Sequence, residues 1–382
     1  MKNSTRSNIV VFFCDQLQRD LLRLYGGKLV NTPNLDALAA DGTVFDEAYT
    51  PTAICSPARA SLMTGLYAHT HHMFNNSTPS YSYCEHLRPG ASMVQDVAAD
   101  IEQFETAYFG KWHIGPADDL FDSRFDHTVA TDGDPDALPF MRSSHWHSKG
   151  GLGELVNPMC SGTAGFYDGP MATNPDVVAA QYSIDFLDHR DKAKSFMLFC
   201  VFPGPHSEWK LPIEWGLRHQ PDETELPANR FDTFKNKPIK QRKERLYQKS
   251  HHTEEVFLRE ATACIYSYIE LIDHELGRVV AKLKAEGQYD NSLIVFTSDH
   301  GDMRGAHGMF SKGAYIYDEI YRIAMVIKPP ANIDAPARIE RAPVTLTDLT
   351  ATMLHVLTGE EQSTIGENTL HGSSLLPLLS GQ

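Results

Sequence analysis

The sequence predicts a three-layer α/β/α protein with a mostly parallel central sheet. Two observations indicate this fold class. Short apolar runs alternate with longer segments of helical periodicity, and most of the apolar runs are continuous rather than alternating with polar residues. Strands that are apolar on both faces belong to a sheet that is covered on both faces. At 382 residues and 42% hydrophobic composition, the chain can bury a core of that kind.

Five apolar runs are the predicted strands. They are Asn8–Phe13, Thr106–Phe109, Phe196–Phe202, Leu293–Thr297 and Ile323–Lys328. Sheets of this type bind their ligands beyond the carboxyl ends of the strands. The polar residues that follow these runs are therefore the first candidates for a functional site.

Four segments between the runs are the predicted helices. They are Pro33–Ala40, Asn174–His189, Phe257–Glu286 and Thr347–Leu357. Thr32 is expected to cap the first of these helices and Gly42 to end it.

Two regions, 118–175 and 207–256, are richer in glycine, proline, charge and histidine than the rest of the chain. Connections of that length usually serve a function, so we expect both to be insertions that cover a site.

Composition narrows the function classes. The net charge is −15 and no stripe of lysine or arginine offsets it, which argues against nucleic-acid binding. There is no stretch of about 18 uninterrupted apolar residues, so we expect no membrane span. The apolar run at Asn8 is too short for a secretory signal, and we expect a cytoplasmic protein. The six cysteines lack Cys-x-x-Cys spacing and are expected to be reduced thiols.

Residues 55–65 are the most informative part of the chain. They read Cys-Ser-Pro-Ala-Arg-Ala-Ser-Leu-Met-Thr-Gly. If this segment begins a helix, Cys55 and Arg59 lie one turn apart on one face, and the helix N-terminus directs free amides toward an anion. Pro57 suits the first turn of such a helix. Taken alone, the pattern would also suit a buried cysteine before an ordinary helix.

The pattern Cys-x-Pro-x-Arg followed by Thr-Gly resembles the signature of the formylglycine-dependent (type I) sulfatases of the alkaline-phosphatase-like superfamily. The resemblance implies an alkaline-phosphatase-like sandwich and a maturation enzyme that oxidises Cys55 to formylglycine, whose hydrate is the nucleophile. It also implies that Arg59 helps to neutralise the sulfate. The chemistry is consistent, because the hydrate keeps a second hydroxyl that can expel sulfate, whereas a serine would be trapped as its sulfated ester.

The resemblance also implies a divalent metal site. Asp15 and Gln16 follow the first predicted strand, where the family usually has two aspartates, and Asp299 and His300 follow the strand at 293–297. With an oxygen of the modified Cys55, these residues would form the ligand set. The oxygen ligands favour Ca²⁺, whereas the imidazole leaves Mn²⁺ open.

Four further residues resemble the family's sulfate-binding blocks. Lys111 and His113 stand in a Gly-Lys-Trp-His block, which implies a lysine on the sulfate oxygens and a histidine that takes a proton from the hydrate. His206 and Lys312 match residues that flank the bridging ester oxygen, and either one would protonate the leaving group. Asn76 falls where relatives have an asparagine that touches the substrate.

Other polar residues near these blocks are expected to have supporting roles. His69, His71 and His72 imitate a metal cluster but are expected to be structural. Asp302 and His307 are expected to lie behind the metal ligands or in a loop beside them.

The resemblance extends from Asn8 to Pro330. We expect a catalytic domain at 1–345, followed at 346–382 by a C-terminal helix and the start of a subdomain that is short or truncated. Relatives carry a small antiparallel sheet with a helix at this place.

Three functions remain open from the sequence. The first is a sulfatase that releases inorganic sulfate from a small-molecule or carbohydrate ester. The second is a phosphonate monoester or phosphodiester hydrolase with the same nucleophile, which Gln16 and His300 favour and Lys111 and His113 oppose. The third is an inactive relative that binds sulfated ligands, which the intact motif at Cys55 opposes. The expected partners are a sulfated substrate and a formylglycine-generating enzyme.

Overall fold

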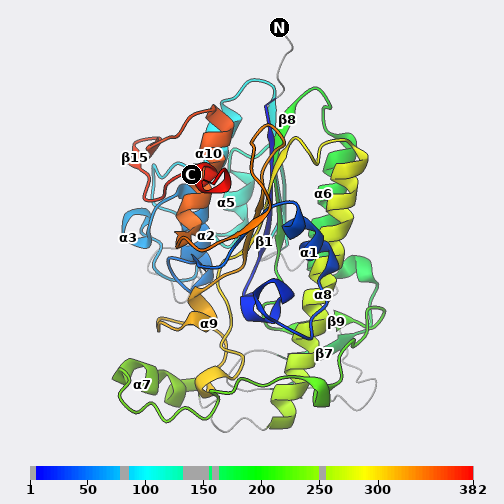
Figure 1. Cartoon of the computed structure of the whole chain (residues 1–382), viewed down its shortest axis with the longest axis vertical. Helices are drawn as coiled ribbons and strands as arrows, with labels where there is room; N and C mark the ends of the chain where they lie inside the picture. The colour runs from blue at the N-terminus through cyan, green and yellow to red at the C-terminus, as the bar shows by residue number, and fades with distance from the viewer. Residues whose placement is uncertain (1–5, 78–85, 132–154, 157–162, 249–254, 382) are drawn as a thin grey trace.

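The structure is a computed structural model that describes residues 6–77, 86–131, 155–156, 163–248 and 255–381. Its centre is an eight-stranded sheet (Figure 1). In spatial order the strands are β12 (Arg338–Glu340), β2 (Thr43–Phe45), β11 (Met325–Lys328), β10 (Ser292–Ser298), β1 (Asn8–Cys14), β8 (Ser195–Phe202), β4 (Phe104–Gly110) and β5 (His127–Ala130). Only β11 runs against its neighbours, so the expected mostly parallel sheet is confirmed.

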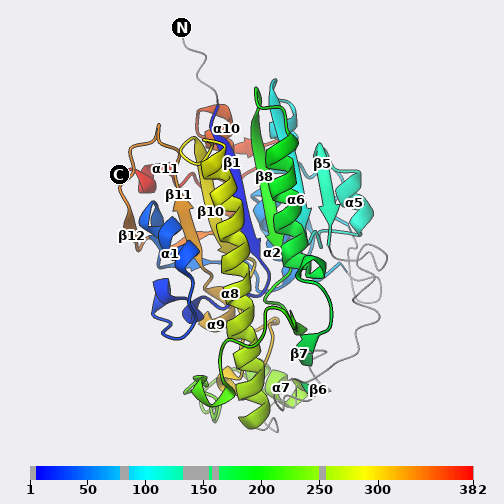
Figure 2. The same ribbon diagram turned by 90° about the vertical axis from the view of Figure 1, so that its right-hand side faces the viewer.

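Helices cover both faces of this sheet (Figure 2). One face carries α1 (Pro33–Ala40), α6 (Pro175–His189) and α8 (Glu255–Ala285), and the other carries α2 (Cys55–Thr64), α4 (Val94–Ala99) and α10 (Leu346–Thr358). The side chains of β1 alternate between two cores. Val10 and Phe12 pack with α6 and α8, whereas Val11 and Phe13 pack with α2 and α10. The continuous apolar run therefore reflects burial on both sides.

Shorter elements complete the chain. They are α3 (Ala68–His71), α5 (Ala117–Phe121), α7 (Ile239–Gln248), α9 (Asp318–Tyr321), α11 (Leu376–Leu379), β3 (Ala48–Tyr49), β6 (Leu155–Val156), β7 (Thr163–Tyr167), β9 (Trp209–Pro212), β13 (Val344–Thr345), β14 (Thr364–Ile365), β15 (Asn368–Thr369), and the 3₁₀ turns η1 (Arg19–Leu21), η2 (Arg23–Tyr25), η4 (Met171–Thr173), η5 (Pro221–Glu223) and η7 (Ala306–Gly308). In the described part of the chain, no helix is long and apolar enough to cross a membrane.

The five expected strands and four expected helices are all present, with ends that differ by at most two residues. The strands β2, β5 and β12 of this sheet were not expected, because three or four residues are too few to show a periodicity. The cysteines at 14, 55, 200 and 264 are buried free thiols, and those at 84 and 160 lie outside the described residues.

The two expected insertions hold secondary structure of their own. The first contributes β6 and β7 and the second contributes β9, and these strands form a separate small sheet. The first region also contains β5, which pairs with β4 in the main sheet, so its expected start at residue 118 is wrong. Together with α7, this sheet lies beyond the carboxyl ends of the main strands (Figures 1 and 2). The stretches 132–154, 157–162 and 249–254 of these insertions lie outside the described residues.

The start of α1 is stabilised by a residue from α8 rather than by its own N-cap. Thr32 occupies the N-cap position, but its hydroxyl has no hydrogen-bond partner among the described residues. Instead, the carboxylate of Asp273 accepts the amide of Leu35 at 2.8 Å and that of Asn34 at 3.2 Å. The expected capping role of Thr32 is therefore wrong. A long-range contact satisfies amides that a local cap would otherwise hold.

We expect Asp273→Ala to lower the free energy of unfolding by about 1–2 kcal/mol, the usual cost of removing a helix cap. Urea unfolding would measure this loss. Thr32→Val is the matched control, because it removes a hydroxyl that bonds to nothing, and its effect should stay within about 0.5 kcal/mol. If the two variants lost equal stability, the assignment of the cap to Asp273 would be wrong.

Candidate active site

The carboxyl ends of three adjacent strands bring the first candidates together. Parallel register places Cys14 of β1 beside Ser298 of β10 and Phe202 of β8. The chain leaves all three strands at the same level, and the amide of Asp299 donates to the carbonyl of Cys14 at 3.1 Å. Asp15 and Asp299 are therefore neighbours, and both are fully buried.

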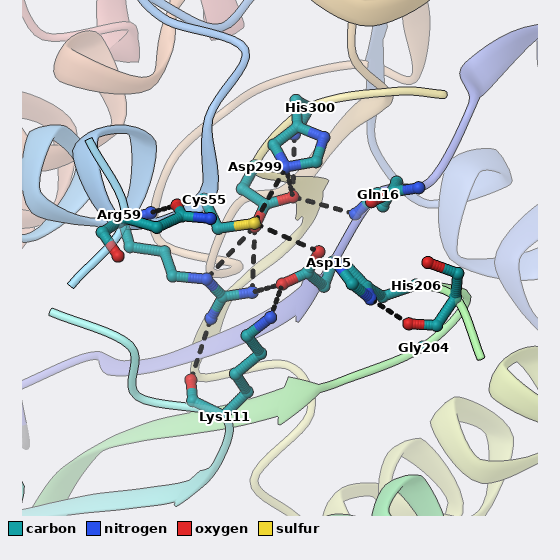
Figure 3. A network of polar contacts seen from close by, with 12 residues as sticks. Asp15, Gln16, Cys55, Arg59, Lys111, Gly204, His206, Asp299 and His300 are labelled. Atoms are coloured by element: carbon teal, nitrogen blue, oxygen red, sulfur yellow. Dashed lines mark hydrogen bonds and ion pairs between the residues drawn. The ribbon is translucent and has the colours of Figure 1, made fainter. Parts of the chain in front are cut away.

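Cys55 reaches this pair of carboxylates from the first residue of α2, so the expected helix start is confirmed. Its Sγ lies 3.2 Å from Nε2 of His300 and 3.8 Å from Oδ1 of Asp15. Figure 3 shows the sulfur between these two side chains. The side chain of the expected nucleophile thus points into the cluster of expected metal ligands.

Arg59, one turn further along α2, lies between the two carboxylates (Figure 3). Its Nη2 is 3.0 Å from Oδ2 of both Asp15 and Asp299, and its Nη1 donates to the carbonyl of Lys111 at 2.8 Å. The side chain is 1% exposed. The guanidinium thus binds both carboxylates and holds the two expected metal ligands in place, while its expected part in neutralising the sulfate stays a prediction.

Lys111 follows β4 through a glycine that the geometry requires. Gly110 has φ +127°, and a Cβ there would lie 1.8 Å from the carbonyl oxygen of Val201. Beyond this turn, Nζ of Lys111 lies 2.5 Å from Oδ2 of Asp15. His113 follows in the left-handed region at φ +55°, and its buried Nδ1 has no partner among the described residues. Both residues thus lie at the same end of the sheet as Cys55.

Gln16 lies between two charged residues that fix the orientation of its amide. Its Nε2 donates to the carboxylate of Asp302, and its Oε1 accepts from Nζ of Lys312 at 2.5 Å. The same Nζ is 2.6 Å from Nε2 of His206, whose Nδ1 contacts the carbonyl of Ser207. Asp302 was expected behind the metal ligands or in a loop beside them, and the structure brings it into direct contact with Gln16, one of the expected ligands.

The cations of the site control the protonation of Cys55 and Asp15. Burial opposes ionisation of the Cys55 thiol, but Lys312, Lys111 and His300 outweigh it and hold its pKa well below the ordinary value. Burial and Cys55 also oppose ionisation of Asp15, yet Lys111, His206 and Arg59 lower its pKa.

The pKa shifts of the neighbouring groups have the same origins. Burial and the charge of Asp15 raise the pKa of Asp299. Burial would lower the pKa of His300, but the negative charges of Asp299 and Cys55 raise it. Burial and Lys312 lower the pKa of His206, so its imidazole is neutral near neutral pH.

The donor set fits a divalent cation. One ligand atom from each of Asp15, Cys55, Asp299 and His300 can be chosen so that all four lie within 4.8 Å of one another. All four side chains are buried. Two carboxylates, one imidazole and one group from Cys55 are donors that a divalent cation accepts, and the backbone amide of Gln16 donates to Oδ1 of Asp299 at 2.9 Å.

The remaining expected residues have structural contacts. Oδ1 of Asn76 accepts the amide of Ser56 at 3.2 Å, beside the start of α2. His71 is buried, its Nε2 lies 3.1 Å from Oγ of Ser61, and burial lowers its pKa to about 4, so its expected structural role is confirmed. His69 and His72 are exposed. His307 lies in the loop and pairs with Asp232.

The residues that hold the His206 loop carry no signal in the sequence. Oδ1 of Asp176 accepts the amide of Gly204 at 2.9 Å, and Oδ2 accepts the hydroxyl of Tyr268 at 2.6 Å. Burial raises the pKa of Asp176 to about 6. From sequence, Asp176 looks like an ordinary acidic residue in the first turn of a helix.

Comparison with known proteins agrees with this geometry. The profile of the sulfatase family matches residues 7–359, which is most of the chain. The chain belongs to the sulfatase family. It is 29% identical to an arylsulfatase of Clostridium perfringens (86% of this chain, 69% of that protein). It is 24% identical to an N-acetylglucosamine-6-O-sulfatase of Bacteroides thetaiotaomicron (100% and 72%).

A solved structure with the same fold is a phosphonate monoester hydrolase of Agrobacterium radiobacter. Its TM-score is 0.78 at 26% identity, with 98% of this chain and 77% of that chain covered. The expected alkaline-phosphatase-like fold is thereby confirmed, and the sulfatase is a sulfuric ester hydrolase. Membership of the family also implies a divalent metal and a formylglycine made from cysteine.

We expect Asp302→Asn to weaken metal binding by about tenfold to a hundredfold, the usual range when a residue that orients a ligand is changed. An asparagine would offer an amide instead of a carboxylate to Gln16, so the glutamine amide would no longer be fixed in one orientation. Titration of the metal-free protein with Ca²⁺ and Mn²⁺ measures the effect. Asp222→Asn, on exposed η5, is the matched control. Unchanged affinity would show that this contact does not orient a ligand.

Proposed function

We propose that this sulfatase hydrolyses the sulfate ester of a carbohydrate or other small molecule through a formylglycine made from Cys55. The observation that carries the proposal is the position of the Cys55 sulfur. It lies 3.2 Å from His300 and 3.8 Å from Asp15, at the start of a helix and among several cations. An anionic ester and a nucleophile at this position would meet in the same buried site.

Sulfate ester hydrolysis at this site would also use a divalent cation and the formylglycine hydrate. A divalent cation held by Asp15, Gln16, Asp299 and His300 would supply Lewis-acid stabilisation of the sulfate oxygens. The oxygen donors favour Ca²⁺, and the imidazole keeps Mn²⁺ as the alternative. The formylglycine hydrate would supply a nucleophilic hydroxyl and a second hydroxyl that expels sulfate.

The side chains around Cys55 would bind the sulfate, accept a proton and orient the carboxylates. Lys111 adds a positive charge beside Asp15, where it can also bind a sulfate oxygen. His113 can accept the proton that the second hydroxyl releases. Arg59 keeps the two carboxylates apart and oriented.

Lys312 is the better candidate for the general acid. Its ammonium lies 2.6 Å from Nε2 of His206, whose lowered pKa leaves the imidazole neutral and able to accept a hydrogen bond. We therefore assign proton donation to Lys312 and its orientation to His206. A departing alcohol would receive a proton from the same Nζ that contacts Gln16.

One observation favours phosphorus esters as the second candidate. Gln16 and His300 give a ligand set with fewer negative charges than an all-aspartate set, and the phosphonate monoester hydrolase shares the fold closely. Lys111 and His113 favour sulfate, because the Gly-Lys-x-His block resembles the sulfatase pattern. We therefore propose a sulfatase with a lower activity on phosphonate monoesters.

We expect Cys55→Ala to reduce turnover of an aryl sulfate by about a thousandfold or more, because it removes the nucleophile. The control is Cys264→Ala on α8, which removes another buried thiol away from the site and should leave the rate unchanged. Mass spectrometry of the peptide that contains residue 55 should show an aldehyde in place of the thiol. Unmodified Cys55 in protein from a host that matures sulfatases would argue against the covalent mechanism.

We expect an aryl sulfate to be cleaved with a higher kcat/KM than the aryl phosphonate with the same leaving group. His113→Ala should lower the sulfatase rate by about a hundredfold or more, the range for loss of a general base. Both measurements require protein in which the aldehyde has been confirmed. An equal or reversed preference would identify the enzyme as a hydrolase of phosphorus esters.

A further inference from the structure

A strongly basic segment stands out on this acidic protein. Residues 230–248 contain seven lysines and arginines against two acidic residues, a local net charge of +5, whereas the whole chain carries −15. The expected absence of a basic stripe is therefore wrong for this segment. Overall net charge had concealed it. The structure places the segment at the carboxyl ends of the main strands, where it includes α7 (Figure 1).

The cations of α7 point outward. Ile239, Lys240, Arg242 and Lys243 are exposed, whereas Arg245 on the opposite side is half-buried. Lys240 has an ion pair with a glutamate of the same helix, at 3.4 Å.

Three basic side chains of this segment have no carboxylate partner in the described ranges. They are Lys235, Arg242 and Lys243, and all three are exposed. Solvated cations of this kind are available to an external anion without the loss of an internal contact.

The inner side of α7 connects it to the loop that carries Lys312. Nε2 of Gln241 donates to the carbonyl of Ile316 at 3.3 Å, and Nη1 of Arg245 donates to the carbonyl of Asp232 at 2.7 Å. The carboxylate of Asp232 in turn contacts Nδ1 of His307 at 2.6 Å. These contacts attach the basic helix to both sides of the 303–317 loop, whose Lys312 reaches into the active site.

Apolar groups are exposed beside the cations. Phe231 is 76% exposed, Ile239 63% and Ile316 75%. The guanidinium of Arg230 lies 4.5 Å from the centre of the Phe231 ring. A sugar polymer with sulfate groups presents both anions and apolar C–H faces, so this combination of cations and exposed apolar side chains is complementary to it.

We propose that α7 and the segment before it, residues 230–248, form a docking surface for a carbohydrate that carries several sulfate groups. The inference rests on the proposed function: one sulfate ester enters the site at Cys55 while further sulfates of the same chain bind the exposed cations. A membrane-binding helix would need a continuous apolar face, whereas Ile239 lies between Arg242 and Lys243 on the outer face of α7. Charge complementarity and attachment to the Lys312 loop favour a sulfated carbohydrate.

The test compares the wild-type protein with Arg242→Gln/Lys243→Gln. Both positions are exposed and glutamine favours helix, so the variant should fold. The probes are dextran sulfate, unsulfated dextran, a single-stranded DNA oligomer and vesicles of anionic lipid. Binding is measured at low and at physiological salt, since attraction between exposed charges weakens with ionic strength.

Two further variants control for the charge itself. Arg242→Lys/Lys243→Arg keeps the charges on α7. Lys28→Gln/Arg341→Gln removes two exposed charges from the loops before α1 and after β12. Turnover of an aryl sulfate and of a sulfated oligosaccharide is measured for all four proteins.

We expect the glutamine double variant to bind dextran sulfate roughly threefold to tenfold more weakly than the wild type, the effect of losing two exposed ion contacts. Its KM for the sulfated oligosaccharide should rise by a similar factor, with kcat and the aryl sulfate reaction unchanged. The charge-keeping variant and the variant at 28 and 341 should both match the wild type.

Dextran sulfate binding that does not change in the glutamine double variant would overturn the proposal. Tighter binding of DNA or vesicles than of dextran sulfate would also overturn it and assign the surface to another partner. Binding is measured without turnover, so its outcome is separate from that of the proposed function. Protein that binds through α7 but cleaves no sulfate ester would contradict only the activity.

Discussion

The buried ion pairs of Arg59 are the interaction on which the site depends. Asp15 and Asp299 leave adjacent strands at one level, and both are removed from solvent. Two carboxylates at this separation repel each other, and burial opposes the ionisation of both. Arg59 offsets this repulsion with one guanidinium that contacts both. Removing one partner of such a buried network leaves an uncompensated charge, which is costly.

Because Arg59 and Cys55 belong to the same helix, the ion pairs also fix the position of Cys55, the proposed nucleophile. All ten residues of α2 are buried, and the helix packs against α10 in the second core. The position of the sulfur relative to His300 is therefore set by two rigid elements, the helix and the sheet. Sites on such elements hold their geometry more closely than sites on loops. Lys312, by contrast, comes from a loop and depends on contacts with Gln16 and His206 for its position.

The features that could be predicted from the sequence are those that depend on short, local patterns of residues. The central strands, the helix at Cys55 and the motif residues were found because each has a periodicity or spacing within a short window. The contacts of Asp273 with α1 and of Asp176 with Gly204 were not found, since they join residues that are far apart in the chain. The ion pairs of Arg59 with Asp15 and Asp299 were also not predicted, because a motif identifies a residue but not the groups that surround it.

Gln16 and Asp302 are best understood as a matched pair. An aspartate at position 16 would bring a further carboxylate near that of Asp302 and have no amide to donate to it, and like charges close together are unfavourable in a buried site. Glutamine avoids this repulsion by donating from Nε2, which directs Oε1 toward Lys312. With glutamine at position 16, the cations Arg59, Lys111 and Lys312 face three carboxylates, those of Asp15, Asp299 and Asp302, whereas a second aspartate would make the carboxylates four. The site therefore repels an anionic ester less than one with the usual pair of aspartates would, so the substitution is compatible with sulfatase chemistry.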